Sequence, residues 1–252
     1  MTLSPANAPV TRTMFALKPT LGRSIAAALL LVAQFIASLL QSAAHGQRLM
    51  LLARLRHGVR VTGSAFRASD FVIVGGSRIA LPLTVATAIA FLMWLYRASE
   101  NVHTVRGGSL EFTPGGAVGS FFIPFLNLVQ PYRAVREVWL ASDPSVLPPV
   151  PMDRGTSTGQ WLVLAWWIPF LTRGLSGWWS LVASHSDLPR IEKLASVSYG
   201  LLASHLLAMP AAAAAIALVY LVDQRQNALG TALEPLDGDA SAVPVAPSGP
   251  TD

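Results

Sequence analysis

The fold is decided by residues 91–143, FLMWLYRASENVHTVRGGSLEFTPGGAVGSFFIPFLNLVQPYRAVREVWLASD. This stretch, called the signature segment below, begins as the end of a membrane-spanning helix. It then passes through an apolar loop broken by Gly and Pro and ends as a short amphipathic helix. Neither half suits water or lipid alone, so we expect the segment to lie where the two meet.

The composition indicates a membrane protein with several spans. Of the 252 residues, 52% are hydrophobic and only 12% are charged, whereas soluble domains carry about 25% charged residues. The net charge of +5 suits contacts of loops with anionic lipid. Nucleic-acid binding is not expected, because no basic, aromatic-rich domain remains outside the apolar runs. The absence of Cys excludes disulfides, thiolate metal sites and Cys nucleophiles.

Long apolar runs lie on both sides of the signature segment. Four runs are expected to cross the ~30 Å hydrocarbon core as helices: about residues 24–44, 79–96, 159–181 and 195–222. The fold class is therefore all-α, with a four-span membrane domain over residues 21–226. Residues 1–20 are expected to form a flexible N-terminal tail, and the acidic, Pro-rich residues 227–252 a disordered C-terminal tail.

Two interpretations stay open near the first run. Basic residues precede it and Ser42-Ala43-Ala44 resembles a signal-peptidase site, so a cleaved signal peptide is the alternative to a retained span. We favour a retained span, because the run is slightly long for a signal peptide. Residues 45–78 then hold six Arg against one Asp. They form either a helix on the membrane surface or a solvated basic connector.

Small and polar side chains mark faces where helices are expected to touch. A stripe of small residues on the fourth run lets another helix approach closely: Gly200, Ser204, Ala208 and Ala212. A polar stripe on the first run suits hydrogen bonds between helices better than a pore lining: Gln34, Ser38 and Gln41.

The second run ends as helices do at a membrane interface. Trp94 and then Arg97 stand at its end, an aromatic belt followed by a charge. The helix is expected to continue to Val105, since Arg97 and Glu100 are i,i+3 partners and Gly107-Gly108 supplies a break.

The loop that follows, residues 115–130, resists a simple placement. Its most apolar part, Gly116 to Leu128, is too short to span a bilayer as a helix, and it contains Pro124. The loop therefore either enters and leaves the membrane on one face (re-entrant) or lies flat at the interface. Irregular backbone at membrane depth needs polar partners, and Asn127 is the side chain expected to supply them if the loop enters.

A short amphipathic surface helix is expected over residues 131–142, because Pro131 suits a first helical turn. One face carries Tyr132, Val135, Val138 and Trp139. The other carries Arg133, Arg136 and Glu137, with Arg133 and Glu137 placed as an i,i+4 pair. Such a helix lies in the interface plane with its aromatic face in lipid, or it packs on its own protein. We favour the interface.

The signature segment resembles that of a bacterial membrane-protein family, catalogued as domain of unknown function 4328. The resemblance rests on WLYRASEN (Trp94–Asn101) and FTPGGAVGSFFIPFLNLVQPYRAVREVWLAS (Phe112–Ser142). Matching positions include Trp94, Arg97, Asn101, Thr113, Pro114, Pro124, Asn127, Pro131, Tyr132, Trp139 and Ser142. Gly116 and Phe121 depart from it, standing where Trp is expected or frequent. The resemblance implies a membrane architecture and no particular activity.

Two residues inside the runs are candidates for function. Arg173 interrupts the third run, where an unpaired charge costs at least ~2.5 kcal/mol. It either reaches polar partners or lipid phosphate, or it snorkels to an interface marked by Trp178 and Trp179, which we favour. His205 lies in the fourth run, where a hydrogen bond between helices is favoured over a proton relay.

The expected function is that of a non-enzymatic membrane protein that binds lipid or a membrane partner through the signature segment. No HExxH, GxSxG or P-loop motif is present, and no metal or cofactor is expected. Candidate functional residues are Arg97, Asn101, Asn127, Tyr132, Arg133, Arg136, Trp139, Arg173 and His205. The alternative is a small transporter or channel that uses Arg173 and His205.

The expected location is the bacterial cytoplasmic (inner) membrane, as a multi-pass protein. Charge counts in the loops give no bias, but cytoplasmic termini would place Arg97, Arg106, Arg133 and Arg136 beside an anionic leaflet. Membrane lipids are the expected partners, together with other membrane proteins or a second copy of the chain.

Overall fold

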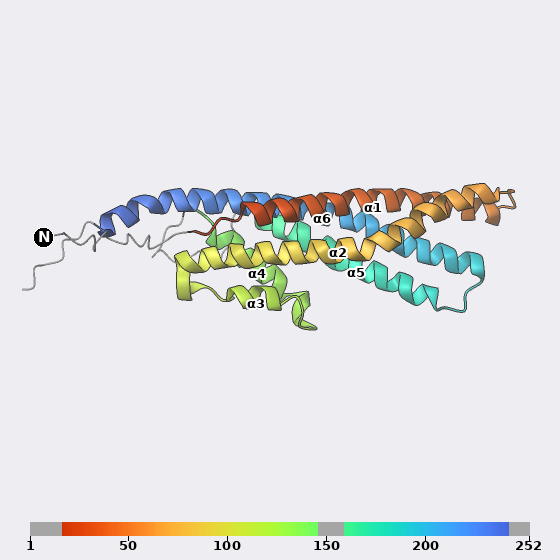
Figure 1. Ribbon diagram of the computed structural model, residues 1–252. Coiled ribbons are helices and arrows are strands. Elements are labelled where there is room, and N and C mark those ends of the chain that lie inside the picture. The colour runs from red at the N-terminus through yellow and green to blue at the C-terminus, as the bar shows by residue number, and fades with distance from the viewer. Residues whose placement is uncertain (1–16, 146–158, 242–252) are drawn as a thin grey trace, which may run out of the picture.

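The computed structural model describes residues 17–145 and 159–241, with side-chain surroundings given up to Leu233. This part of the chain is all-helical and contains no strand. Four long helices form an elongated bundle (Figure 1): α1 Leu21–Arg56, α2 Gly63–Arg106, α5 Gln160–Ser184 and α6 Arg190–Ser241. The all-α prediction is confirmed.

The long helices are arranged as two hairpins. α2 packs along α1, and α6 packs along both α1 and α5. In contrast, α2 and α5 are not among the described helix pairs that pack extensively on each other. The start of α1, the end of α6 and the signature segment lie towards one end of the bundle, and the two hairpin turns lie at the other (Figure 1).

Polar side chains hold α1 against α2. The Thr84 hydroxyl donates to Gln34 Oε1 over 3.3 Å, and Gln41 Nε2 donates to the Val72 carbonyl over 3.3 Å. Near the hairpin turn Arg48 pairs with Asp70. Two of the three residues of the polar stripe, Gln34 and Gln41, thus bond to a neighbouring helix as the sequence predicted, whereas the buried Ser38 hydroxyl finds no partner among the described residues.

Small residues bring α5 and α6 together. A Cβ added to Gly200 would lie 2.2 Å from Ser180 Oγ and 2.9 Å from the Ser176 carbonyl oxygen. The Ser180 hydroxyl donates to the Val197 carbonyl across the same contact, over 3.2 Å. The predicted small-residue stripe is therefore a helix-packing face.

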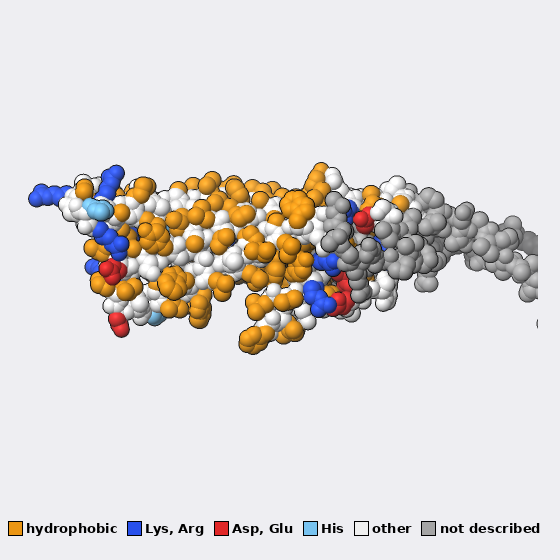
Figure 2. Space-filling view, turned by 180° about the vertical axis from the view of Figure 1, so that it is seen from behind, with side chains coloured by type: hydrophobic (Ala, Val, Ile, Leu, Met, Phe, Trp, Pro, Cys, Tyr) orange, Lys and Arg blue, Asp and Glu red, His pale blue; other side chains and the backbone are white. Residues whose placement is uncertain are grey.

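Three helices are long and apolar enough to cross a membrane: α1, α2 with its 3₁₀ extension to Ser109, and α6 up to Leu233. Figure 2 shows hydrophobic side chains over the long middle of one face, with Lys and Arg towards its ends. Many large hydrophobic side chains of the described residues are exposed, including Leu29 (65%) and Leu81 (72%). A soluble protein would bury such residues, so this is a membrane protein.

Neither expectation for residues 45–78 describes the structure. α1 continues to Arg56 and α2 begins at Gly63, so only a six-residue turn, 57–62, separates the helices. Leu51 and Leu52 are buried in this part of α1, and their packing extends the helix beyond the apolar run.

The expected tails are also shorter than the sequence suggested. α6 continues to Ser241, so residues 227–241 are helical rather than disordered. Leu229 and Leu233 pack with Val105 and Leu17, which gives this part of the helix a partner. Residues 1–16 and 242–252 lie outside the described part.

The signature segment is more helical than expected. α2 ends at Arg106 with Gly107 as its C-cap, as predicted. A short helix α3, Pro114–Gly119, follows, then turns, the 3₁₀ helix η2, Leu126–Leu128, and helix α4, Gln130–Ala141. Phe125 has a positive φ of 65° at the tip of this loop.

The favoured placement of the amphipathic helix is wrong. The apolar face of α4 is buried, with Val135, Val138 and Trp139 no more than 3% exposed. These residues join the main core with side chains of α2, α5 and α6. The helix therefore packs on its own protein, because three neighbouring helices offer its aromatic face more contact than lipid would.

Candidate functional site

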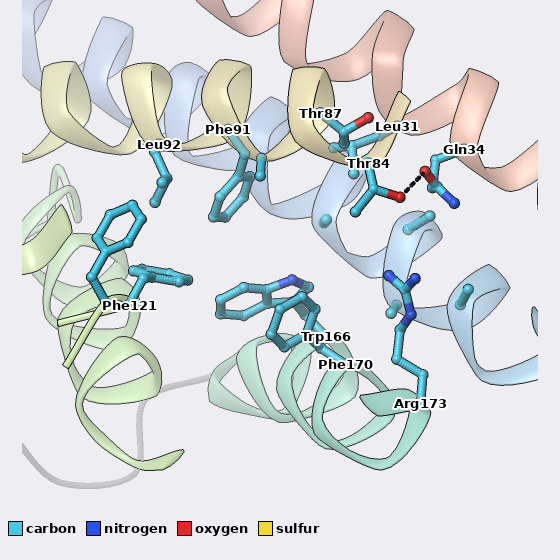
Figure 3. A pocket seen from close by; sticks show the side chains of 16 residues that line it. Leu31, Gln34, Thr84, Thr87, Phe91, Leu92, Phe121, Trp166, Phe170 and Arg173 are labelled. Atoms are coloured by element: carbon cyan, nitrogen blue, oxygen red, sulfur yellow. Dashed lines mark hydrogen bonds between the residues drawn. The ribbon is translucent and has the colours of Figure 1, made fainter. Parts of the chain in front are cut away.

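A cavity of about 280 Å³ lies between α2 and α5 (Figure 3). α1 and α6 form its floor, and the loop after α3 contributes Phe121 and Phe122. Its lining is Leu31, Gln34, Thr84, Thr87, Ala88, Phe91, Leu92, Phe121, Phe122, Trp166, Phe170, Arg173, Ala208, Ala211, Ala212 and Ala215. Because α2 and α5 each pack on a different partner, a space remains between them.

Aromatic rings close one end of this pocket. The ring centroid of Phe91 lies 5.4 Å from that of Trp166 and 6.5 Å from that of Phe121. Phe170 continues the cluster, 6.0 Å from Trp166. These distances are typical of stabilising aromatic pairs, so α2, α5 and the loop are joined by rings at this end.

The other end is polar. Figure 3 shows the Arg173 guanidinium pointing from α5 into the pocket, on the side of Gln34 and Thr84. Within the described part of the chain, Arg173 has no hydrogen bond or ion pair. Snorkelling of Arg173 to a membrane interface, favoured from the sequence, stays a prediction.

Small side chains make the pocket deep. Ala208, Ala211, Ala212 and Ala215 face it from two turns of α6, and all four are buried. Larger residues here would fill the space that the alanines leave. Ala208 and Ala212 also belong to the predicted small-residue stripe, which therefore lines a cavity as well as packing against α5.

Of the two candidate residues of α2, Asn101 lies in a buried polar network and Arg97 lies outside it. Asn101 Nδ2 donates to Gln226 Oε1 over 2.9 Å and to the Lys18 carbonyl over 3.0 Å, and its Oδ1 accepts from the Lys18 N–H. Gln226 Nε2 in turn donates to the Ser142 hydroxyl. Arg97 forms an ion pair with Glu100, 3.2 Å apart, as predicted.

Trp139 is held at the contact of α4 with α6. The Arg225 guanidinium carbon lies 3.9 Å from the ring centroid of Trp139, and Arg225 also donates to the Trp139 carbonyl over 3.1 Å. Arg106 of α2 donates to the Ala141 carbonyl over 2.8 Å. Two arginines therefore bond to backbone carbonyls in the last turn of α4, where cations are favourable.

Asp143 balances these charges. Partial burial alone would raise its pKa, but hydrogen bonds from Ser145 and the positive charges of Arg225 and Arg106 lower the pKa below the ordinary value. Asp143 is thus ionised at neutral pH and fixes the end of α4 against α2 and α6.

The polar face of α4 binds the preceding loop instead of pairing with itself. Arg133 forms an ion pair with Glu111, 2.7 Å apart. Glu137 accepts from the backbone N–H groups of Glu111 and Phe112, over 2.5 and 3.0 Å. The predicted Arg133–Glu137 pair is therefore wrong, because the loop offers both side chains better partners.

The other candidate residues are spread apart. Arg136 donates to Gln160 Oε1 at the start of α5, over 3.0 Å, and Tyr132 packs against the core. No side-chain hydrogen bond of Asn127 occurs among the described residues. The loop carbonyl of Leu128 is instead satisfied by Trp167 Nε1 over 3.1 Å.

His205 lies outside the pocket lining. Its ring stacks on that of His45 in α1, with centroids 5.8 Å apart. The structure thus brings His205 to a helix contact, and it brings Arg173 alone of the nine candidates to the pocket.

Sequence reasoning missed most of the pocket. Thr84, Thr87, Trp166 and Phe170 looked like ordinary span residues, because apolar periodicity does not distinguish a lipid-facing side chain from one facing a cavity. A usable signal was the presence of the polar or charged residues Gln34, Thr84 and Arg173 inside three different apolar runs. Among the described residues, no group of three or more His, Asp or Glu could hold a metal ion.

The fold and the pocket define an all-helical membrane protein with a lateral cavity between two of its helices. The chain belongs to the family described as Domain of unknown function (DUF4328), whose model matches residues 57–224. This confirms the resemblance found in the signature segment, and the matched region covers every pocket residue except those of α1. No curated protein and no solved structure matches the chain.

Proposed function

We propose that this protein is a non-enzymatic, four-span protein of the bacterial cytoplasmic membrane that binds a membrane lipid between α2 and α5. The observation that carries the proposal is the 280 Å³ pocket. It is lined mainly by apolar side chains, and ligand sites are typically apolar cavities of ~300–1,000 Å³ with a few polar groups. In this proposal the pocket lies within the bilayer, so the molecules that surround it are lipids.

α5 is the fourth span in this proposal. Its 25 residues extend over ~37 Å at ~1.5 Å per residue, and it packs along α6. Its outer face is apolar, with Trp161, Ile168 and Leu175 all at least 55% exposed. α1 is also a retained span in this proposal, which the place of Ala27 and Leu31 in the main core supports.

The loop of the signature segment enters the bilayer in this proposal. Phe122 and Phe125 are 70% and 86% exposed, and the neighbouring Leu128 carbonyl is bonded to Trp167 of α5. Bonding of this kind is what irregular backbone needs at membrane depth. Since Phe122 lines the pocket, the loop contacts the bound lipid as well as the bulk bilayer.

Both termini are cytoplasmic in this proposal. The start of α1 and the end of α6 lie towards the end of the bundle that carries the signature segment (Figure 1), and Arg97, Arg106, Arg133 and Arg136 belong to that segment. An anionic cytoplasmic leaflet would attract this basic end.

Filling the pocket tests the lipid-binding proposal. Ala212→Phe places a ring in the pocket floor, so less lipid is expected to copurify with the protein from the membrane, by severalfold. Native mass spectrometry of protein released from detergent or nanodiscs measures the bound lipid directly.

The matched control is Ala213→Phe, one residue along α6, where Ala213 is exposed and does not line the pocket. It should retain the wild-type amount of lipid. Equal lipid on Ala212→Phe and Ala213→Phe would show that the lipid binds elsewhere on the surface.

A small transporter is the second candidate, because Arg173 lines a pocket that lies within the bundle. Substrate sites of transporters also lie inside the helix bundle, near the bilayer midplane. Flux of an anion across vesicles that depends on Arg173 would favour this function over a resident lipid.

A further inference from the structure

The pocket is asymmetric along the bundle axis. On α5, the lining begins at Trp166 and ends at Arg173, and on α2 it runs from Leu92 back to Thr84. Trp166 lies beside Phe91 of α2, so the aromatic end and the polar end are separated by about two helical turns, roughly 10 Å. An occupant therefore meets rings at one end and a cation at the other.

Arg173 gives the polar end its charge. It is the one cationic side chain in the lining, and its neighbours there, Gln34 and Thr84, are neutral. No Asp or Glu lines the pocket. A guanidinium stays protonated in proteins, and a charge at membrane depth without a counter-ion is costly, so an anionic occupant would stabilise this arrangement.

We propose that the pocket binds a free long-chain fatty acid, with its carboxylate on Arg173 and its first methylenes over the alanine floor of α6. This inference rests on the proposed lipid pocket and names its ligand. The rest of the chain leaves past Phe122 into the bilayer, because Phe122 lines the pocket and is exposed.

Three features select a fatty acid among anionic lipids. The volume of about 280 Å³ is below the usual ~300–1,000 Å³ of ligand pockets, which suits one chain and a small head. A carboxylate matches the planar guanidinium and accepts two parallel hydrogen bonds. The Gln34 side chain adds a neutral donor beside the same place: its Oε1 accepts from the Thr84 hydroxyl, and its NH2 group faces the pocket lining.

The depth of Arg173 fits a lipid head. Trp178 and Trp179 are exposed on α5, and exposed Trp marks the membrane interface. Arg173 precedes them by five and six residues, or about 8 Å at ~1.5 Å per residue. The carboxylate would thus lie slightly below the head groups of the leaflet that faces the hairpin turns, with its chain directed towards the bilayer centre.

The test measures binding of tritiated palmitate to the full chain in phosphatidylcholine nanodiscs. Wild type should bind palmitate, and Arg173→Gln should bind it at least about tenfold more weakly, since hydrogen bonds to charged groups are among the strongest. Arg173→Lys should lose less. The control Arg78→Gln removes an exposed arginine of α2 outside the pocket and should bind as wild type does.

Hexadecanol, which has the same chain length without the charge, distinguishes the contact of the carboxylate with Arg173 from binding of the alkyl chain in the pocket. It should bind wild type at least about tenfold more weakly than palmitate. Equal binding of hexadecanol by wild type and Arg173→Gln would show that the variant pocket is intact.

Palmitate bound equally by wild type and Arg173→Gln would overturn the fatty-acid inference and leave the lipid pocket standing. Lysophosphatidylglycerol that displaces palmitate at equal concentration would overturn the choice of a carboxylate. Failure of all three probes, together with unchanged copurified lipid on Ala212→Phe, would overturn the lipid pocket itself.

Discussion

At the scale of single residues, the signature segment serves mainly to join helices. Asn101 and Ser142, both in the stretch that resembles the family, meet Gln226 of α6 in one buried network. Trp139 lies under Arg225. These side chains thus interact with other residues of the protein, whereas Arg173 is the candidate residue that faces a cavity.

The Asn101 network yields a stability prediction. Asn101→Ala leaves Gln226 Oε1 and the Lys18 backbone without their partner, and an unsatisfied buried polar group costs about 1–3 kcal/mol. The free energy of unfolding of the purified protein in mild detergent should fall by that amount, as measured by thermal or denaturant unfolding.

Asn227→Ala is the control for this change. Asn227 follows Gln226 on α6 but is exposed, so its replacement should alter stability by no more than ~0.5 kcal/mol. Equal stability of Asn101→Ala and wild type would mean that water replaces the network.

At the scale of elements, the contact of α5 with α6 sets the width of the pocket. α5 carries Trp166, Phe170 and Arg173 into the cavity, and α6 carries its alanine floor. Gly200 allows the two helices to approach beyond the pocket's polar end. A change at this glycine should therefore act on the pocket from a distance.

Gly200→Ala should destabilise the protein by about 1–3 kcal/mol, the usual effect of overpacking. Its Cβ would meet backbone as well as the Ser180 hydroxyl, so a side-chain rotation cannot relieve the contact. Thermal unfolding in detergent measures the loss.

Gly177→Ala is the matched control on α5. Its Cβ would find Ser204 Oγ at 3.9 Å, an ordinary contact, and alanine favours a helix over glycine by up to ~1 kcal/mol. This variant should be as stable as wild type or slightly more so. The reverse order of the two variants would contradict the packing seen at Gly200.

At the scale of the whole molecule, the two hairpins dictate the topology. Their turns, residues 57–62 and 185–189, lie at the same end of the bundle, opposite the start of α1 and the end of α6 (Figure 1). Four crossings follow if α5 spans the bilayer. Both turns should then face one compartment and both termini the other.

Single cysteines test this arrangement without background, because the chain has no Cys. Cysteines at Val59 and Asp187 should be labelled together by a membrane-impermeant maleimide from one side, and a cysteine at Ser109 from the other. Labelling of Val59 and Asp187 from opposite sides would show that α5 does not cross the membrane.

The sequence by itself determined the membrane class, the family and the end of α2 beside Gly107, and three of the four spans that it predicted lie in helices long and apolar enough to cross a membrane. Length and apolarity decide whether a segment leaves water, and these are local properties. The sequence also identified Arg173 as unusual, because a charged residue within an apolar run can be recognised from the sequence alone.

Only the tertiary structure decided where α4 lies, how far α1 and α6 extend, and that Arg173 faces a pocket. Lipid and protein interiors are equally apolar. An amphipathic helix such as the one that carries Trp139 therefore has the same sequence pattern whether its apolar face contacts lipid or protein. Which one it meets depends on the neighbouring helices. The cavity itself arises because α2 and α5 pack on different partners, a relation between helices that no single segment of sequence contains.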